Sequence, residues 1–123
     1  MYLADRDILK FVREGRIEIR PHFLETHLRP IGLRVHLGAP LLIAQKGQLV
    51  DLETPSKLEY DSHDLAKEAY ILEPGRFVLA STIEQIRTAR DLICTLEGRS
   101  TIARIGLSIH NTASMLEGTQ VDW

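Results

Sequence analysis

Residues 96–106 read Leu-Glu-Gly-Arg-Ser-Thr-Ile-Ala-Arg-Ile-Gly and combine a glycine turn with a helical spacing. Gly98 permits a tight backbone turn, because glycine adopts conformations that are closed to other residues. Beyond it, Ile102 and Ile105 stand three positions apart, which places them on one side of a helix. The segment therefore predicts one or two turns of helix over residues 100–105, beginning near Gly98 or the serine two positions on.

The same segment carries the side chains of an anion site. Arg99 and Arg104 supply forked N–H donors that match phosphate oxygens, and Ser100 and Thr101 add hydroxyl donors. By spacing alone, a pair of solvated or salt-bridged arginines is an equally good interpretation, and the hydroxyls can simply cap the helix. Free backbone N–H groups at the helix start would add to the site. The ligand that suits this chemistry is a phosphorylated small molecule.

Outside this segment, the chain is a series of short apolar runs separated by turn residues. Residues 5–13 place apolar side chains on one helical face, with Asp5 as a candidate N-cap and Gly15 just past the end. The expected strands are residues 17–20, 33–37, 41–44, 49–52, 70–72, 77–82, 92–96 and 107–110. Turns are expected at Gly38-Ala39-Pro40, Lys46-Gly47 and Pro74-Gly75. Many short strands with frequent turns predict an all-β sandwich or barrel.

Length and composition predict one small domain without a polymeric partner. A chain of 123 residues is long enough for a single core. Residues 54–67, the most polar stretch, are expected to be a surface loop, so residues 1–123 form one domain. The net charge of -2 gives no attraction to a nucleic-acid polymer or an acidic membrane. Because neither a signal peptide nor a long apolar run is evident, we expect a soluble, cytoplasmic protein.

The arginine segment resembles the Gly-Arg-Ser-Ser-Leu-Ala-Arg-x-Gly segment of the dCTP deaminase and dUTPase superfamily. Other stretches match the deaminase branch in the same order along the chain. Residues 4–8 and 15–21 resemble its Ser-Asp-Arg-Asp-Ile and Gly-x-Ile-x-Ile-x-Pro opening, residues 74–82 resemble its Pro-Gly-Glu-Phe-Val-Leu-Ala-Ser-Thr strand, and residues 110–113 are similar to its His-x-Thr-Ala. The resemblance implies a mainly β, dUTPase-like distorted jelly roll or barrel, with a short N-terminal helix and a short helix after the Gly-Arg-Ser turn.

The resemblance also implies a function, the hydrolytic deamination of dCTP to dUTP in pyrimidine deoxynucleotide metabolism. The nucleotide-binding positions that it implies are Arg99, Ser100, Thr101, Ile102, Ala103, Arg104, His110, Thr112, Ala113 and Glu117. Of these, Ser100 would position the reacting water, and Arg104 and Glu117 are the other catalytic candidates. Mg²⁺ would be held mainly by the nucleotide phosphates, and the sites would lie between subunits of a homotrimer.

Cysteine and histidine usage bears on metal chemistry. Cys94 is the only cysteine and lies in an apolar run, so we expect a buried structural thiol. One cysteine cannot supply the His-x-Glu and Pro-Cys-x-x-Cys ligand set of a zinc nucleobase deaminase, so no zinc is expected. The histidines at positions 22, 27, 36 and 63 show no metal-ligand spacing. His110, taken alone, is best interpreted as a buried, hydrogen-bonded histidine.

Three departures from the family pattern leave the activity open. Arg34 stands where relatives carry the carboxylate of Ser-Tyr-Asp-Leu-x-Leu-Gly, and Glu117 replaces the aspartate of Ile-Asp-x-Gly with an acid one methylene longer. The general acid/base glutamate of the family lies beyond that aspartate and is absent from these residues, so the domain is expected to be incomplete at its C-terminus. The alternatives are a catalytically silent nucleotide-binding or regulatory relative, a dUTP diphosphatase, and a β domain that has lost its ligand.

Overall fold

The computed structural model describes residues 2–53 and 57–118, and strands outnumber helices among them. Contacts divide the chain into two compact units. Unit 1 combines the described residues up to Arg34 with those from Gln85 onward, and unit 2 is Val35–Glu84. Within the described residues, no helix has both the length and the apolar content needed to cross a membrane.

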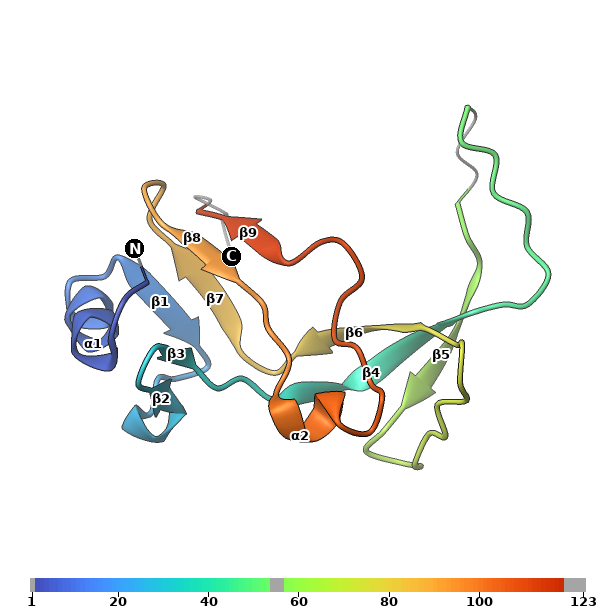
Figure 1. The fold of residues 1–123 in the computed structure, drawn as a ribbon, viewed down its shortest axis with the longest axis horizontal. Coiled ribbons are helices and arrows are strands. Elements are labelled where there is room, and N and C mark those ends of the chain that lie inside the picture. Colours follow the sequence, from blue (N-terminus) through green and yellow to red (C-terminus); the bar gives the residue numbers. More distant parts are fainter. Residues whose placement is uncertain (1, 54–56, 119–123) are drawn as a thin grey trace. The chain divides into compact units, whose positions relative to one another are not determined.

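Unit 1 is built from two α-helices and three small antiparallel sheets (Figure 1). Its first part contains α1 (Asp5–Arg13), β1 (Ile17–Arg20), the 3-10 helix η1 (Glu25–His27), β2 (Leu28–Arg29) and β3 (Gly32–Leu33). Its second part contains β7 (Gln85–Thr88), β8 (Ile93–Thr95), α2 (Ser100–Ala103) and β9 (Met115–Glu117). The pairs are β1 with β7, β2 with β3, and β8 with β9.

α1 ends where the sequence places a glycine. Gly15 has a φ of 69°, a left-handed conformation that is strained for other residues. The N–H of Arg16 donates to the carbonyl of Phe11 at 2.8 Å, and the N–H of Gly15 donates to that of Val12 at 3.1 Å. These two bonds form a Schellman motif, which satisfies carbonyls that the helix leaves open.

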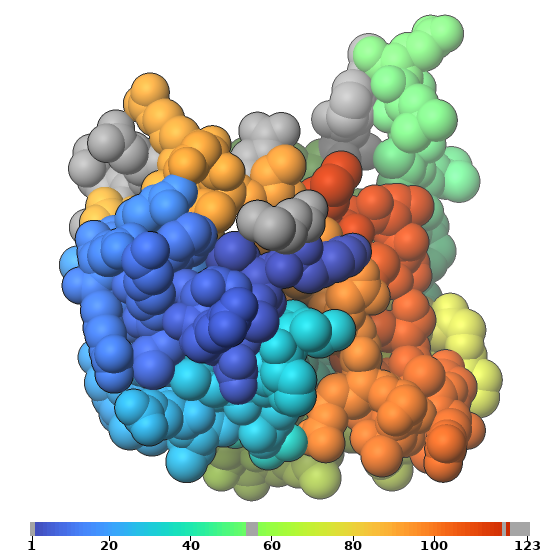
Figure 2. All heavy atoms as spheres, turned by 60° about the vertical axis from the view of Figure 1, so that its left-hand side comes forward, coloured from blue at the N-terminus to red at the C-terminus, as the bar shows by residue number. Residues whose placement is uncertain are grey.

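The start of α1 differs from the expectation. Ala4 is the N-cap and makes no side-chain cap, so the prediction of Asp5 as N-cap is wrong. Asp5 is the first helical residue, where its carboxylate accepts a hydrogen bond from the N–H of Arg6 at 2.7 Å and favours the positive end of the helix dipole. The N–H of Asp5 donates to the carbonyl of Pro30 at 3.2 Å, which ties α1 to the β2–β3 hairpin. Figure 2 shows α1 in blue beside that hairpin.

Ion pairs join the β1–β7 ribbon to its surroundings. Glu18 and Arg87 are directly opposite in the register and form a salt bridge across the ribbon. Arg16 pairs with Asp91 at 2.5 Å, and its guanidinium lies 4.1 Å from the centre of the Phe11 ring. The hydrogen bond from Arg16 lowers the pKa of the Asp91 carboxyl. The end of α1 is thus linked to the turn between β7 and β8.

Unit 2 is a three-stranded antiparallel sheet centred on β4 (Leu37–Ala44), with β5 (Tyr60–Asp64) on one side and β6 (Val78–Thr82) on the other. The turn expected at Gly38-Ala39-Pro40 is wrong, because these residues lie in β4. Gly38 is needed there for close approach, since a Cβ would come within 3.1 Å of the Ser81 carbonyl oxygen. Pro40 falls where the β4–β6 register shifts between Leu37 and Leu41, and a bulge tolerates a missing N–H.

The two ends of unit 2 are held together by one buried carboxylate. Glu84, only 6% exposed, accepts a hydrogen bond from the backbone N–H of His36 at 2.8 Å. Its other oxygen lies 2.6 Å from the Nδ1 of the His36 ring. The N–H of Ile83 donates to the His36 carbonyl at 2.8 Å. Burial raises the pKa of the Glu84 carboxyl, but the hydrogen bonds from His36 outweigh it and the pKa is lowered.

The predicted mainly β fold is confirmed, as are the short N-terminal helix and the short helix after Gly98-Arg99-Ser100. The described strands form four separate sheets rather than one closed barrel. The turns at Lys46-Gly47 and Pro74-Gly75 are also confirmed. The strands expected at 49–52, 70–72 and 107–110 are wrong, and in 33–37 only the end of β3 and the first residue of β4 are strand. β5 lies inside the stretch expected to be a loop.

Few apolar side chains are buried. Among the described residues the buried apolar core consists of Ile8, Ile17 and Leu41, each about 5% exposed or less. Ile93, Met115 and Leu116 on the β8–β9 ribbon are more than half exposed. A large apolar side chain contributes stability mainly when it is removed from water, so the ribbon leaves apolar area uncovered.

Candidate functional site

α2 sets the positions of the two arginines that were expected to bind phosphate. Arg99 is the N-cap, with extended backbone angles, and its carbonyl accepts the N–H groups of Ile102 and Ala103, both at 2.9 Å. Arg104 is the C-cap. Because an α-helix rises about 1.5 Å per residue, the two arginines stand roughly 7.5 Å apart along the axis. They lie at opposite ends of one turn of helix, and both are exposed.

The hydroxyls of this segment make no cap. Ser100 and Thr101 are exposed at the start of α2, and no side chain caps the helix. The interpretation of these residues as caps is therefore wrong, and the hydroxyls are accessible to a ligand. Ile102 is half-buried, whereas Ala103 is exposed.

Two glycines shape the ends of this segment by different means. Gly98 does not have a positive φ; a Cβ there would come within 3.2 Å of the Cγ1 of Ile109, so the glycine allows close approach. Gly106 has a φ of 81° and closes the helix, with its N–H donating to the Ala103 carbonyl at 3.0 Å. The segment is thus packed against the loop that leads toward β9.

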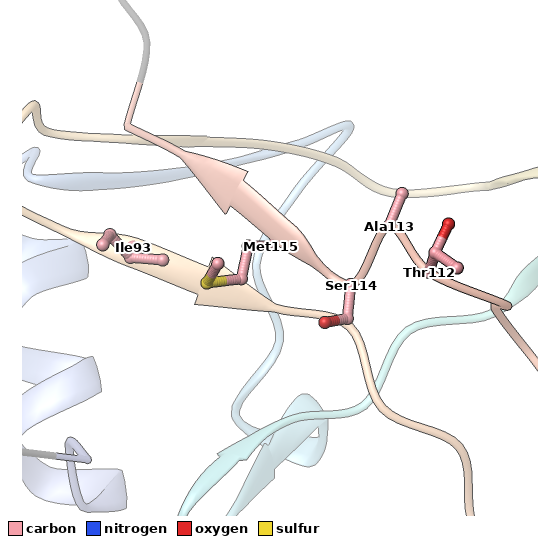
Figure 3. Close-up of a pocket in the computed structure, with 5 residues that line it drawn as sticks. All are labelled: Ile93, Thr112, Ala113, Ser114 and Met115. Atoms are coloured by element: carbon pink, nitrogen blue, oxygen red, sulfur yellow. The ribbon is translucent and has the colours of Figure 1, made fainter.

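A pocket of about 370 Å³ lies at the β8–β9 ribbon, and its lining residues are Ile93, Thr112, Ala113, Ser114 and Met115. Figure 3 shows Ile93 and Met115 on the two neighbouring strands, with Ser114 directly before β9 and Thr112 earlier on the same loop. The lining combines two large apolar side chains with two hydroxyl groups, and Ile93 and Met115 are 67% and 69% exposed, so the pocket is open to solvent. Thr112 and Ala113, two of the predicted nucleotide-binding positions, are among these lining residues.

His110 precedes this pocket in the chain and has an unusual environment. The residue is half-buried, and its ring Nδ1 is buried without a hydrogen-bond partner among the described residues. The expectation of a hydrogen-bonded histidine is therefore wrong for this nitrogen. Its backbone carbonyl accepts the Ser108 hydroxyl at 2.8 Å, which fixes the local chain. A buried polar atom without a partner costs free energy, and a ligand that supplied one would recover it.

The remaining predicted residues fall into two groups. The residues of α2 do not line the pocket, so the structure gives two separate sets, one on α2 and one at the ribbon. Glu117 is the last residue of β9, opposite Ile93 in the register. Cys94 in β8 is half-buried rather than fully buried, and burial raises the pKa of its thiol, so it is protonated at neutral pH.

One basic residue acquires a role that the sequence reasoning missed. Arg34 was noted only as a departure from a family pattern. In the structure, burial and the charges of Arg29 and Arg99 lower the pKa of its guanidinium. The available signal was a pair of arginines, Arg29 inside the short hairpin at residues 28–33 and Arg34 directly after it, whereas the effect of Arg99 could come only from the fold.

Comparison with known proteins identifies the family. The dCTP deaminase-like family model matches residues 2–119. The dCTP deaminase of Thermomicrobium roseum is 37% identical over 95% of this chain and 62% of its own length. The dUMP-forming dCTP deaminase of Methanoculleus marisnigri is 32% identical over 95% of this chain and 63% of its own length. The dCTP deaminase of Rhodospirillum rubrum is 34% identical over 95% and 65%, respectively.

This protein belongs to the dCTP deaminase-like family. The resemblance predicted from the arginine segment is therefore confirmed. The chain spans about 62% of the length of the T. roseum relative.

Proposed function

We propose that this domain binds dCTP and contributes to its zinc-independent hydrolytic deamination. The observation that carries the proposal is the pocket of about 370 Å³ lined by Thr112 and Ala113, the two residues that match the Thr-Ala of the family motif. Its apolar wall suits a flat pyrimidine ring, and its hydroxyls suit the polar edge of that ring. Phosphates would be held by Arg99 and Arg104, whose charged donors make strong hydrogen bonds to phosphate oxygens.

Deamination replaces the amine on the cytosine ring by oxygen from water, and the amine leaves as ammonia. It requires a base that deprotonates the water and an acid that protonates the ring nitrogen, and one carboxyl group can perform both transfers. In this proposal the exposed hydroxyl of Ser100 positions the water. Glu117 carries the one carboxylate among the ten nucleotide-binding positions and is the candidate proton shuttle of these residues. The His110 ring would donate to or accept from the bound base.

Mg²⁺ fits this proposal as a companion of the nucleotide. Mg²⁺ prefers oxygen ligands, chiefly carboxylates, phosphates and water. The exposed groups of residues 99–104 are guanidinium and hydroxyl groups, with no carboxylate among them. Phosphate oxygens of the nucleotide would therefore supply most of the ligands. When bound, the ion would neutralise charge on the phosphates and hold the triphosphate in one conformation. The arginines would orient the triphosphate.

A second candidate function concerns the phosphate chain. Some relatives are named dCTP deaminase, whereas others are named dCTP deaminase, dUMP-forming. Deamination is common to both names, and the product of this step alone is dUTP. A dUMP-forming protein would also cleave the phosphate chain. The identity of the product distinguishes these two functions directly.

The test is to incubate the 123-residue chain with Mg²⁺ and either dCTP or dUTP, and to separate the nucleotides by ion-exchange chromatography. Conversion of dCTP to dUTP supports the deaminase, dUMP from dCTP supports the second candidate, and dUMP from dUTP alone indicates a diphosphatase. Arg104→Gln is expected to weaken dCTP binding by about tenfold or more. Arg13→Gln, which removes an exposed charge from α1, is the matched control. Wild-type protein that does not bind dCTP would overturn the proposal, and binding without any product would support the silent alternative.

We also propose that the sites form in a homotrimer. The exposed side chains of Ile105 and Leu116, at 79% and 58%, lie outside the pocket lining and give each chain apolar area to bury against another copy. Sedimentation velocity should give about three times the chain mass of 13.9 kDa, and a monomer at all concentrations would contradict it.

A further inference from the structure

The β2–β3 hairpin presents two arginines on one face. Arg29 lies opposite Gly32 in the register of the hairpin. The N–H of Arg34 donates to the His27 carbonyl at 2.7 Å, so these two residues form one further pair beyond the β2–β3 strands. Side chains alternate between faces along a strand, so Arg29 and Arg34 share a face at diagonal positions. Diagonal neighbours in a ladder have Cα atoms about 7–8 Å apart, within reach of long side chains.

A third guanidinium approaches from α2. Arg99 is the exposed N-cap of that helix, and its positive charge acts on Arg34 together with that of Arg29. Figure 2 shows the hairpin, in blue to cyan, on the same face as the orange α2 segment. The three side chains come from two parts of the chain that are far apart in sequence, and the packing of unit 1 brings their charges together.

No carboxylate neutralises this cluster within the described part of the chain. Arg29 donates to the Leu28 carbonyl at 3.0 Å, and none of the three arginines forms a salt bridge there. By contrast, Arg16 and Arg87 of the same unit each pair with an acidic residue. Three adjacent positive charges repel one another, and the repulsion is relieved when an anion binds among them.

The accessibility of the cluster indicates the class of anion. Arg29 and Arg99 are exposed and Arg34 is half-buried, so a ligand can reach all three from solvent. Planar guanidinium groups match the oxygens of phosphate in a bidentate geometry. Three such groups suit a chain of phosphates better than a single monoanion, because each can pair with a different charged oxygen.

We propose that Arg29, Arg34 and Arg99 form a site for the polyphosphate chain of the nucleotide, with Arg34 as the residue that completes it. This inference rests on the proposed nucleotide-binding function and adds Arg29 and Arg34 to it. Arg34 stands where the family pattern has a carboxylate, which would repel phosphate instead. Arg34 thus places a positive charge where that pattern has a negative one.

The test measures binding of inorganic tripolyphosphate, dCTP and deoxycytidine by calorimetry, without Mg²⁺ and at low salt. Arg34→Gln and Arg29→Gln are each expected to weaken the binding of tripolyphosphate and of dCTP about tenfold, and to leave the binding of deoxycytidine unchanged. Arg13→Gln removes the same charge from α1 and should change no affinity more than about twofold. Arg29 is exposed, so its substitution does not disturb packing and keeps the test valid if Arg34→Gln fails to fold.

The outcomes separate this inference from the function that it rests on. If wild-type protein binds dCTP, while Arg34→Gln and Arg29→Gln bind tripolyphosphate and dCTP as tightly as it does, the three-arginine site is refuted and the function stands. A second outcome is that tripolyphosphate binds only when Arg34 is present, that dCTP binds no more tightly than tripolyphosphate, and that deoxycytidine does not bind. In that case the anion site stands and the proposed nucleotide function fails.

Discussion

Replacement of Glu84 by glutamine should destabilise the protein by about 1–2 kcal/mol at neutral pH. The carboxylate is 6% exposed and accepts hydrogen bonds from both the backbone and the ring of His36, at 2.8 and 2.6 Å. Glu84→Gln keeps the shape but removes the charge, and hydrogen bonds to charged groups contribute about 1.5–3 kcal/mol against about 1 for neutral ones. The corresponding fall in Tm is about 4 °C for each kcal/mol in a domain near this size.

The effect should depend on pH in a defined direction. The pKa of Glu84 is lowered in the folded protein from its ordinary value of 4.5, because the hydrogen bonds from His36 outweigh the effect of burial. A lowered pKa adds stability that is fully present above the unfolded pKa and is lost as the pH falls through the folded one. The difference between wild type and Glu84→Gln should therefore be constant above about pH 6 and shrink below 4.5.

Urea unfolding followed by circular dichroism at a series of pH values is the assay. Glu73→Gln serves as the matched control, because Glu73 is an exposed residue of the same unit, and its substitution should change stability by less than about 0.5 kcal/mol. The reasoning is refuted if Glu84→Gln is as stable as wild type at pH 7. It is also refuted if a loss of stability persists unchanged at pH 3.

Three further predictions follow from single residues. Gly15→Ala should cost about 1–2 kcal/mol in urea unfolding, because the φ of 69° is strained for alanine, and an unchanged midpoint would contradict the Schellman turn. Gly98→Ala should place a methyl group 3.2 Å from the Ile109 side chain and lower the Tm. In the double variant, Ile109→Ala should recover part of that loss, and additive effects of the two changes would argue against this contact. Cys94 should react with a thiol reagent far more slowly than free cysteine at pH 7, since burial raises the pKa of its thiol, and a rate equal to that of the free amino acid would refute the burial.

The parts of the fold that the sequence predicted are those with a local cause. The helical face of residues 5–13 and the glycine that ends it lie within one short segment, and α1 has the expected bounds. The turn at Pro74-Gly75 likewise depends on the residues themselves, with Gly75 at a φ of 73° and the N–H of Arg76 donating to the Glu73 carbonyl at 3.2 Å.

The errors in the predicted strands arise because a strand depends on a partner strand as well as on its own sequence. β5 has the polar sequence Tyr-Asp-Ser-His-Asp, which no apolar alternation marks, and it is a strand because β4 offers its hydrogen-bonding edge along the whole length. Residues 107–110 show the opposite error. Their apolar side chains suggested a strand, but the segment has no partner strand in the described structure and leads as a loop toward the pocket.

The candidate site divides in the same way. A contiguous motif predicts Thr112 and Ala113 as nucleotide-binding residues; both line the pocket, and their binding of a nucleotide stays a prediction. The cluster of Arg29, Arg34 and Arg99 was not predicted, because the charge of Arg99 acts on Arg34 only through the tertiary fold. The sequence also predicts that Arg99 and Arg104 bind phosphate together; they lie at opposite ends of α2, and this pairing stays a prediction.

The most direct test of the account is an NMR titration of the isotope-labelled chain, comparing amide shifts caused by dCTP with those caused by tripolyphosphate. Both ligands should shift the amide signals of Arg34 and Arg99, and dCTP alone should also shift those of Thr112 and Ala113. If dCTP binds but leaves Thr112 and Ala113 unmoved, the pocket at the β8–β9 ribbon does not receive the base, and the proposed site is wrong.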